Sequence, residues 1–128
     1  MRILLATIIT SLCALCTSCS EPAVESQSPV LVEIQKKGPE SKRTLKLEIE
    51  GMMCEKYCVT KIKKELLEQE AVSNVIIDFE KERETDYAIV EFDPKGNTTE
   101  NIYGTVNTIA DGKLYTVKSV EVTYYRPE

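Results

Sequence analysis

Histidine and tryptophan are both absent from the 128 residues of this chain. Without histidine there is no imidazole base, no Cys–His pair and no Cys/His zinc site. The few glycines form no glycine-rich phosphate loop. Basic residues number 16 and acidic residues 21, giving a net charge of −5, whereas nucleic-acid binding needs clustered Lys and Arg. We therefore expect neither an enzyme nor a nucleic-acid-binding protein.

The chain has one marked hydrophobic stretch, at its very start. It follows Arg2 and extends from Ile3 to Leu15, too short for a bilayer, which takes about 20 residues. A basic start, an apolar stretch and small residues before a cleavage site are typical of a secretory signal. Because Thr17 and Ser18 precede Cys19, this segment resembles the signal of a bacterial lipoprotein, in which the cysteine becomes the lipidated first residue. An ordinary cleaved signal is the alternative.

On this basis the chain divides into a signal peptide over residues 1–18, a lipidated tether over 19–43 and a folded domain over 44–126. The tether is rich in Ser, Pro, Glu, Gln and Lys, a composition typical of a solvated linker. Val30 to Ile34 interrupt it with alternating apolar residues, which form either an added edge strand or a turn of the tether. Two or more acyl chains make a stable anchor. We expect a lipid-anchored protein of the bacterial cell envelope, periplasmic or surface-exposed.

From Thr44 onward, strand and helix periods of hydrophobicity alternate. The predicted elements are a strand around residues 45–49, a helix over about 55–70, strands around 75–79 and 88–92, a helix capped by Thr98 or Thr99 and stopped at Gly112, and a strand over 115–125. This order predicts an α+β, ferredoxin-like βαββαβ sandwich, a four-stranded antiparallel sheet with both helices on one face. Such a domain of roughly 80 residues buries a core without a disulfide or metal.

Two cysteines, Cys54 and Cys58, stand between the first strand and the first helix of this domain, and they are its only thiols. The free N–H groups and positive end of a helix favour thiolates. Two thiolates without histidine suit Cu(I), which accepts two or three sulfurs, better than Zn(II), which takes four ligands. Other soft ions rank next. The residues alone leave a soft-metal site, a redox dithiol and a structural disulfide open.

The sequence Gly51-Met52-x-Cys54 after a strand, with Cys58 opening a helix, resembles the heavy-metal-associated domain over about residues 44–125. That family includes copper chaperones, domains of copper-transporting ATPases and periplasmic mercury-binding proteins. The resemblance implies that Cys54 and Cys58 ligate the metal and that Met52 packs beneath their loop. The chain differs from the family in two respects, of which the first is its spacing, C-x-x-x-C where the family has C-x-x-C.

Three further residues are candidates for the site. Met53 stands where the family usually has a polar residue, and its thioether is either a third soft ligand or an inert loop side chain. Lys113 and Tyr115 precede the last strand, in a loop that approaches the cysteines in this fold. The alternatives for these two are a solvated lysine and a core tyrosine.

Together these patterns predict an exported, lipid-anchored protein that binds a soft metal ion, Cu(I) before others, and carries or scavenges it by thiolate exchange. The expected partners are a metal donor or acceptor, such as a copper transporter, and the membrane that holds the anchor. We expect a monomer. A binding module with a passive Cys54–Cys58 disulfide and a thiol redox protein remain as alternatives.

Overall fold

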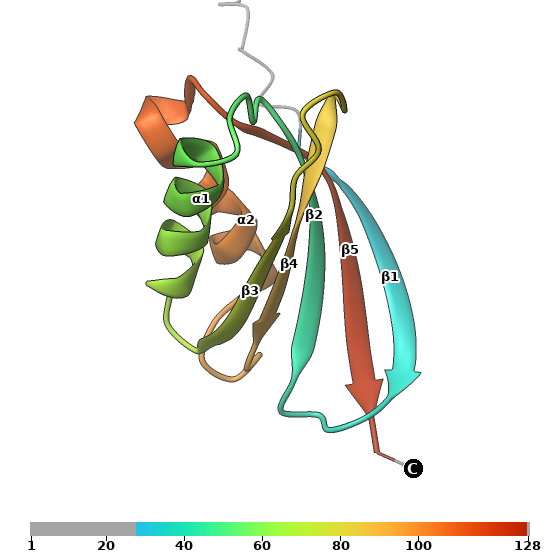
Figure 1. Cartoon of the computed structure of the whole chain (residues 1–128). Helices are drawn as coiled ribbons and strands as arrows, with labels where there is room; N and C mark the ends of the chain where they lie inside the picture. Colours follow the sequence, from blue (N-terminus) through green and yellow to red (C-terminus); the bar gives the residue numbers. More distant parts are fainter. Residues whose placement is uncertain (1–27, 128) are drawn as a thin grey trace, which may run out of the picture.

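The computed structural model describes residues 28–127 and folds them into one sheet with two helices on one of its faces (Figure 1). The elements are β1 (Val30–Lys37), β2 (Arg43–Glu50), α1 (Tyr57–Leu67), β3 (Val72–Asp78), β4 (Thr85–Phe92), α2 (Thr99–Thr108), the short 3-10 helix η1 (Ile109–Gly112) and β5 (Thr116–Arg126). The predicted signal peptide and Cys19 lie outside the described residues. Within the described part, no helix is long and apolar enough to cross a membrane.

The prediction of a four-stranded antiparallel ferredoxin-like sheet is wrong, because the sheet has five strands in the order β1-β5-β2-β4-β3 and is mixed. The added strand, β1, runs parallel to β5, whereas the other neighbouring pairs are antiparallel. An edge strand leaves a row of backbone N–H and C=O groups that another strand can pair. Residues of the predicted tether pair with β5 in this way. The choice left open for Val30 to Ile34 is thus decided in favour of an edge strand, so the sheet includes residues that precede Thr44.

The hydrophobic core lies between the sheet and the two helices. In β2 the predicted alternation is confirmed, since Leu45, Leu47 and Ile49 are fully buried and Lys46 is exposed. The buried residues that the helices contribute are Cys58, Ile62, Leu66, Thr99, Ile102 and Val106. Burying side chains of this size stabilises a fold by roughly 1.5–3 kcal/mol each. The apolar residues that recur with the strand period and those that recur with the helix period therefore pack together in one core.

The strand β1 enters the sheet at the end where β2 leaves it. Val30 pairs with Ser119 of β5, and Ser119 pairs with Glu48 near the end of β2. The loop that carries the cysteines follows directly after Glu50. The first residues of β1 thus lie two strands away from the start of the cysteine loop, at the same end of the sheet, as Figure 1 also shows.

Candidate metal centre

The two cysteines lie side by side, with their Sγ atoms 3.2 Å apart, and both are free thiols. Cys54 is exposed in the loop after β2, whereas Cys58 is the second residue of α1 and is only 7% exposed. The C-x-x-x-C spacing does not separate them, because residues 55 and 56 form a turn that leads directly into α1. The structure therefore brings together the two residues that the sequence singled out as ligands.

The start of α1 points its unpaired backbone N–H groups toward this loop. Lys56 is the N-cap residue, its side chain makes no capping hydrogen bond, and the first turn contains no acidic residue. The first N–H groups of a helix lack partners within the helix and carry the positive end of its dipole. Negative charge on either sulfur is therefore stabilised from the helix side. The helix begins at Tyr57, two residues later than the sequence pattern predicted.

The surroundings of Cys58 favour its thiolate form. Burial alone raises the pKa of this thiol, but the Tyr115 hydroxyl beside it and hydrogen bonds from Cys54 and from the backbone of Met53 and Cys54 outweigh burial and lower the pKa to about 7. A cysteine at this pKa is a thiolate in about half of the molecules at neutral pH. In about half of the molecules one ligand of the pair is thus already deprotonated for a metal ion.

The phenol of Tyr115 is the buried partner of this thiolate. Tyr115 is 2% exposed. Among the described residues, its buried hydroxyl has no partner that meets the distance and angle of a regular hydrogen bond. Burial and the nearby Cys58 sulfur both raise the pKa of Tyr115. The hydroxyl therefore stays protonated and can serve as a hydrogen-bond donor. Of the two alternatives for Tyr115, core packing is confirmed, and its role in supporting the site stays a prediction that its place beside Cys58 favours.

Tyr115→Phe is expected to raise the pKa of Cys58, because it removes the hydroxyl that lies beside the sulfur and stabilises its thiolate form. Thiolate absorbance followed against pH measures this directly. The folded-state pKa of Cys58 lies below its ordinary value, so its contribution to stability is present in alkaline solution and is lost as pH falls through about 7. That loss should be smaller in the variant. An unchanged thiolate titration would remove Tyr115 from the site.

The residues before the thiols fix the path of the loop. Gly51 has φ +106°, and a Cβ at this position would lie 2.1 Å from the carbonyl oxygen of Leu114. Met52 is 7% exposed and belongs to the core. The cysteine loop therefore contacts the loop before β5 through Gly51 and the core through Met52. Cys54, which follows, is exposed.

Met53 and Lys113 differ from these supporting residues in being exposed. Met53 is 86% exposed, and with Cys54 it lines an open hollow of about 510 Å³ that also includes Phe79 from the loop after β3. Lys113 caps the end of η1, and no described contact joins its side chain to the thiols. The thioether of Met53 is thus free to turn toward a metal ion, whereas Lys113 lies as a solvated lysine.

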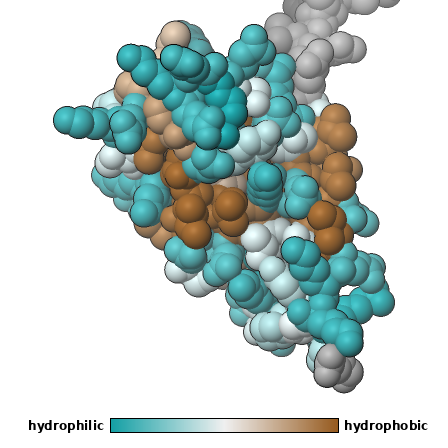
Figure 2. All heavy atoms as spheres, turned by 45° about the vertical axis from the view of Figure 1, so that its right-hand side comes forward, coloured by the Kyte–Doolittle hydropathy of each residue, from teal (hydrophilic) through white to brown (hydrophobic). Residues whose placement is uncertain are grey.

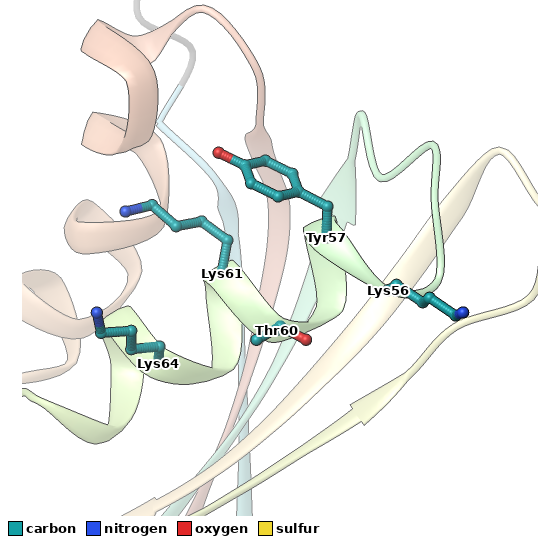
Figure 3. Close-up of a pocket in the computed structure, with 5 residues that line it drawn as sticks. All are labelled: Lys56, Tyr57, Thr60, Lys61 and Lys64. Atoms are coloured by element: carbon teal, nitrogen blue, oxygen red, sulfur yellow. The ribbon is translucent and has the colours of Figure 1, made fainter.

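The outer face of α1 adds one feature that sequence reasoning missed. Tyr57 is 64% exposed beside Cys58 and, with Thr60 and three lysines, lines a hollow of about 410 Å³ (Figure 3). Figure 3 shows Tyr57 and Lys61 extending from the same side of the helix, whereas Lys56 points the other way. The only signal in the sequence is an aromatic residue one position ahead of a cysteine. The rim of the site thus carries an exposed ring that an approaching protein can contact.

The donor set of the site is small. Among residues 28–127, no group of three or more His, Cys, Asp or Glu side chains lies together as metal ligands. Metal–thiolate bonds of about 2.3 Å place two sulfurs about 3.8 Å apart at a tetrahedral angle and about 4.6 Å apart in a line. From 3.2 Å the sulfurs must separate by about 1 Å, which the exposed loop position of Cys54 allows. The residues fit an ion that is satisfied by two sulfurs, and they do not complete a zinc shell.

No protein-family model matches this chain, no curated protein matches it, and no solved structure matches its fold. The resemblance to the heavy-metal-associated domain therefore stays a prediction from the motif and its context.

Proposed function

We propose that the protein binds one soft metal ion, with Cu(I) as the preferred ion, through the thiolates of Cys54 and Cys58. The observation that supports this most directly is the thiol pair itself, with sulfurs 3.2 Å apart, at the start of a helix. The chain would be exported, anchored to a membrane of the bacterial envelope through Cys19, and would carry or scavenge the ion. Its partner would be a metal donor or acceptor, such as a copper transporter.

The unequal burial of the two thiols suits transfer by ligand exchange. Cys58 is buried and has a pKa lowered to about 7, so it holds the ion from the inside. Cys54 is exposed, so a ligand of the partner can reach the ion from its side and replace this sulfur first. The reaction changes only metal–sulfur bonds and needs no acid or base from the protein.

The choice of Cu(I) follows from the number and kind of ligands. Thiolate and thioether sulfur are soft ligands, which select Cu(I) over hard cations. Zn(II) requires two further ligands that the described residues do not bring together. Ag(I) and Hg(II) share the preference for few, soft ligands and rank next.

A Cu(I) titration tests the proposal. The chain from Ser20 onward, which contains every described residue, is kept reduced and free of oxygen and titrated against a chromophoric chelator, with Zn(II) in parallel. We expect one equivalent of Cu(I) per chain, bound at least about a thousandfold more tightly than Zn(II), a difference of about 4 kcal/mol. Failure to compete with the chelator would overturn the metal proposal.

The same separation of the sulfurs also places them well for oxidation to a disulfide in an oxidising compartment. Oxidising the protein before the titration should abolish Cu(I) binding, and reduction should restore it. If the reduced protein does not bind Cu(I), a passive disulfide explains the Cys54–Cys58 pair better than a metal site.

A further inference from the structure

The sheet is longer than the helices that cover it. β5 has 11 residues and spans roughly 33 Å, whereas α2 has 10 residues and spans roughly 15 Å. Figure 1 shows β1, β2 and β5 continuing past both helices, toward the turn that joins β1 to β2. At that lower end Figure 2 shows teal and white residues, and its brown residues lie higher. The end of the sheet that the helices leave uncovered is therefore polar.

Arg43, the first residue of β2, lies on the helix side of this end. It pairs with Phe92 and with Tyr124, and paired residues share a face, which for Phe92 is the core face. The guanidinium carbon of Arg43 lies 4.6 Å from the centre of the Tyr124 ring and 5.9 Å from that of the Phe92 ring. Among residues 28–127, no carboxylate forms an ion pair with it. Two rings thus hold in place a guanidinium that has no anionic partner in the described part of the chain.

Arg43 and Tyr124 line a hollow of about 470 Å³, which is within the size range of small-molecule sites. The same hollow includes a second basic residue, Arg126, and two acidic residues, Glu33 and Glu40. In the described structure no ion pair joins any of these four charged side chains to another. Charges of both signs therefore line one hollow without neutralising each other by direct contact.

The carboxylate of Glu33 is held by the same tyrosine that Arg43 stacks on. It accepts a hydrogen bond from the Tyr124 hydroxyl at 3.2 Å. Burial above all, and then this hydrogen bond, raise the pKa of Tyr124, so its hydroxyl stays protonated and serves as the donor. One side chain thus positions a guanidinium over its ring and a carboxylate at its hydroxyl.

We propose that this hollow binds a small zwitterion, a free amino acid, with its carboxylate on Arg43 and its ammonium group on Glu33. A guanidinium suits a carboxylate because it offers two parallel hydrogen bonds, and an ammonium group makes charge-assisted hydrogen bonds with a carboxylate. A simple anion would be repelled by Glu33 and Glu40, and a simple cation by the two arginines, so a ligand with both charges fits the hollow better than either. The hollow is separate from the thiols, because β2 begins at Arg43 and reaches the cysteine loop roughly 23 Å away.

An NMR titration of the reduced, metal-free chain from Ser20 onward tests the proposal, with glycine, leucine, glutamate and lysine as free amino acids. At least one of the four should bind with a Kd of about 1 mM or below. The N-acetyl and the amide forms of that amino acid each lack one of the two charges, and both should bind at least about tenfold more weakly. If none of the four binds, or if a blocked form binds as tightly as the free amino acid, the proposal is overturned.

Two variants assign the two charges of the ligand. Arg43→Gln and Glu33→Gln should each weaken binding at least about tenfold, because each removes the partner of one charge. Glu33 is exposed on the edge strand β1, so Glu33→Gln keeps the fold even if Arg43→Gln disturbs the packing at Phe92. The matched control is Lys46→Gln, which removes a cation 4.5 Å from the ring of Tyr87 on the other face of β2, and it should bind like the wild type.

The same titration also locates the ligand. The backbone signals of Glu33 and Tyr124 should shift on binding, whereas the signal of Cys54 should not, since it lies at the other end of β2. Wild-type affinity in both Gln variants, or shifts centred on the cysteine loop, would contradict the proposed site.

Discussion

Cys54→Ser and Cys58→Ser should each lower the affinity for Cu(I) by more than about a hundredfold, and the double variant should lose tight binding altogether. The reason is that the described residues supply only these two thiolates, so a single change removes half of the strong ligands. Changes outside the ligands of a metal site already cost about 10–100-fold. Competition with a Cu(I) chelator, under reducing and oxygen-free conditions, measures the loss.

The folded state is the necessary control, and the structure predicts that the two variants differ in it. Cys54 is exposed, so serine there should leave the free energy of unfolding unchanged. Cys58 is buried beside Tyr115, and serine there should cost about 1 kcal/mol because a hydroxyl enters the core. Met53 is an exposed neighbour of Cys54, and the Cu(I) affinity of Met53→Ala shows whether its thioether also binds the ion. If both serine variants keep wild-type Cu(I) affinity, the thiol pair is not the site.

Gly51→Ala is expected to destabilise the fold by about 3 kcal/mol or more. At φ +106° an alanine is strained, and its Cβ would lie 2.1 Å from the Leu114 carbonyl oxygen, a backbone atom that cannot turn aside. The loop must therefore move away from the loop before β5, and the cysteines move with it. Urea unfolding monitored by circular dichroism measures the effect, and Cu(I) affinity should fall in parallel.

Gly104 offers a matched control within the same chain. It lies in α2, and a Cβ at this position would meet no atom within 4 Å, so Gly104→Ala should stabilise the protein by up to about 1 kcal/mol through helix propensity. Opposite signs for the two Gly→Ala changes are the expected result. Equal, small effects would mean that the Gly51 loop does not pack closely against Leu114.

Much of the element order was predictable because each element buries one face in a single core. Leu45, Leu47 and Ile49 alternate because β2 has one covered face, and this alternation indicates a strand without knowledge of its neighbours. The start of α2 was equally readable. The Thr98 hydroxyl accepts a hydrogen bond from the Asn101 backbone N–H at 3.2 Å, a local contact that the sequence itself encodes.

The added strand could not be read in the same way, and this is why the predicted sheet was wrong. A strand that exposes both faces has no burial period, and residues Val30 to Val32 are exposed on either side of β1. The alternating residues from Val30 to Ile34 suggested a strand, but its partner is β5, about 90 residues later in the chain, and the side-chain pattern does not say which strand it pairs with. The nearness of Tyr115 to the cysteines was expected from the fold, whereas the direction of its hydroxyl, toward the Cys58 sulfur, depends on how the loop before β5 packs against the start of α1.

The position of β1 in the sheet also limits how far the two thiols can lie from a membrane anchor at the N-terminus of the chain. If Cys19 is lipidated, as proposed, residues 20–29 can extend at most about 35 Å between the anchor and the start of β1, which lies at the cysteine end of the sheet. The cysteine loop would then explore a thin layer next to the membrane, and its encounters would become a search in two dimensions. Partners embedded in that membrane would be met often, whereas proteins deeper in the compartment would lie beyond its reach.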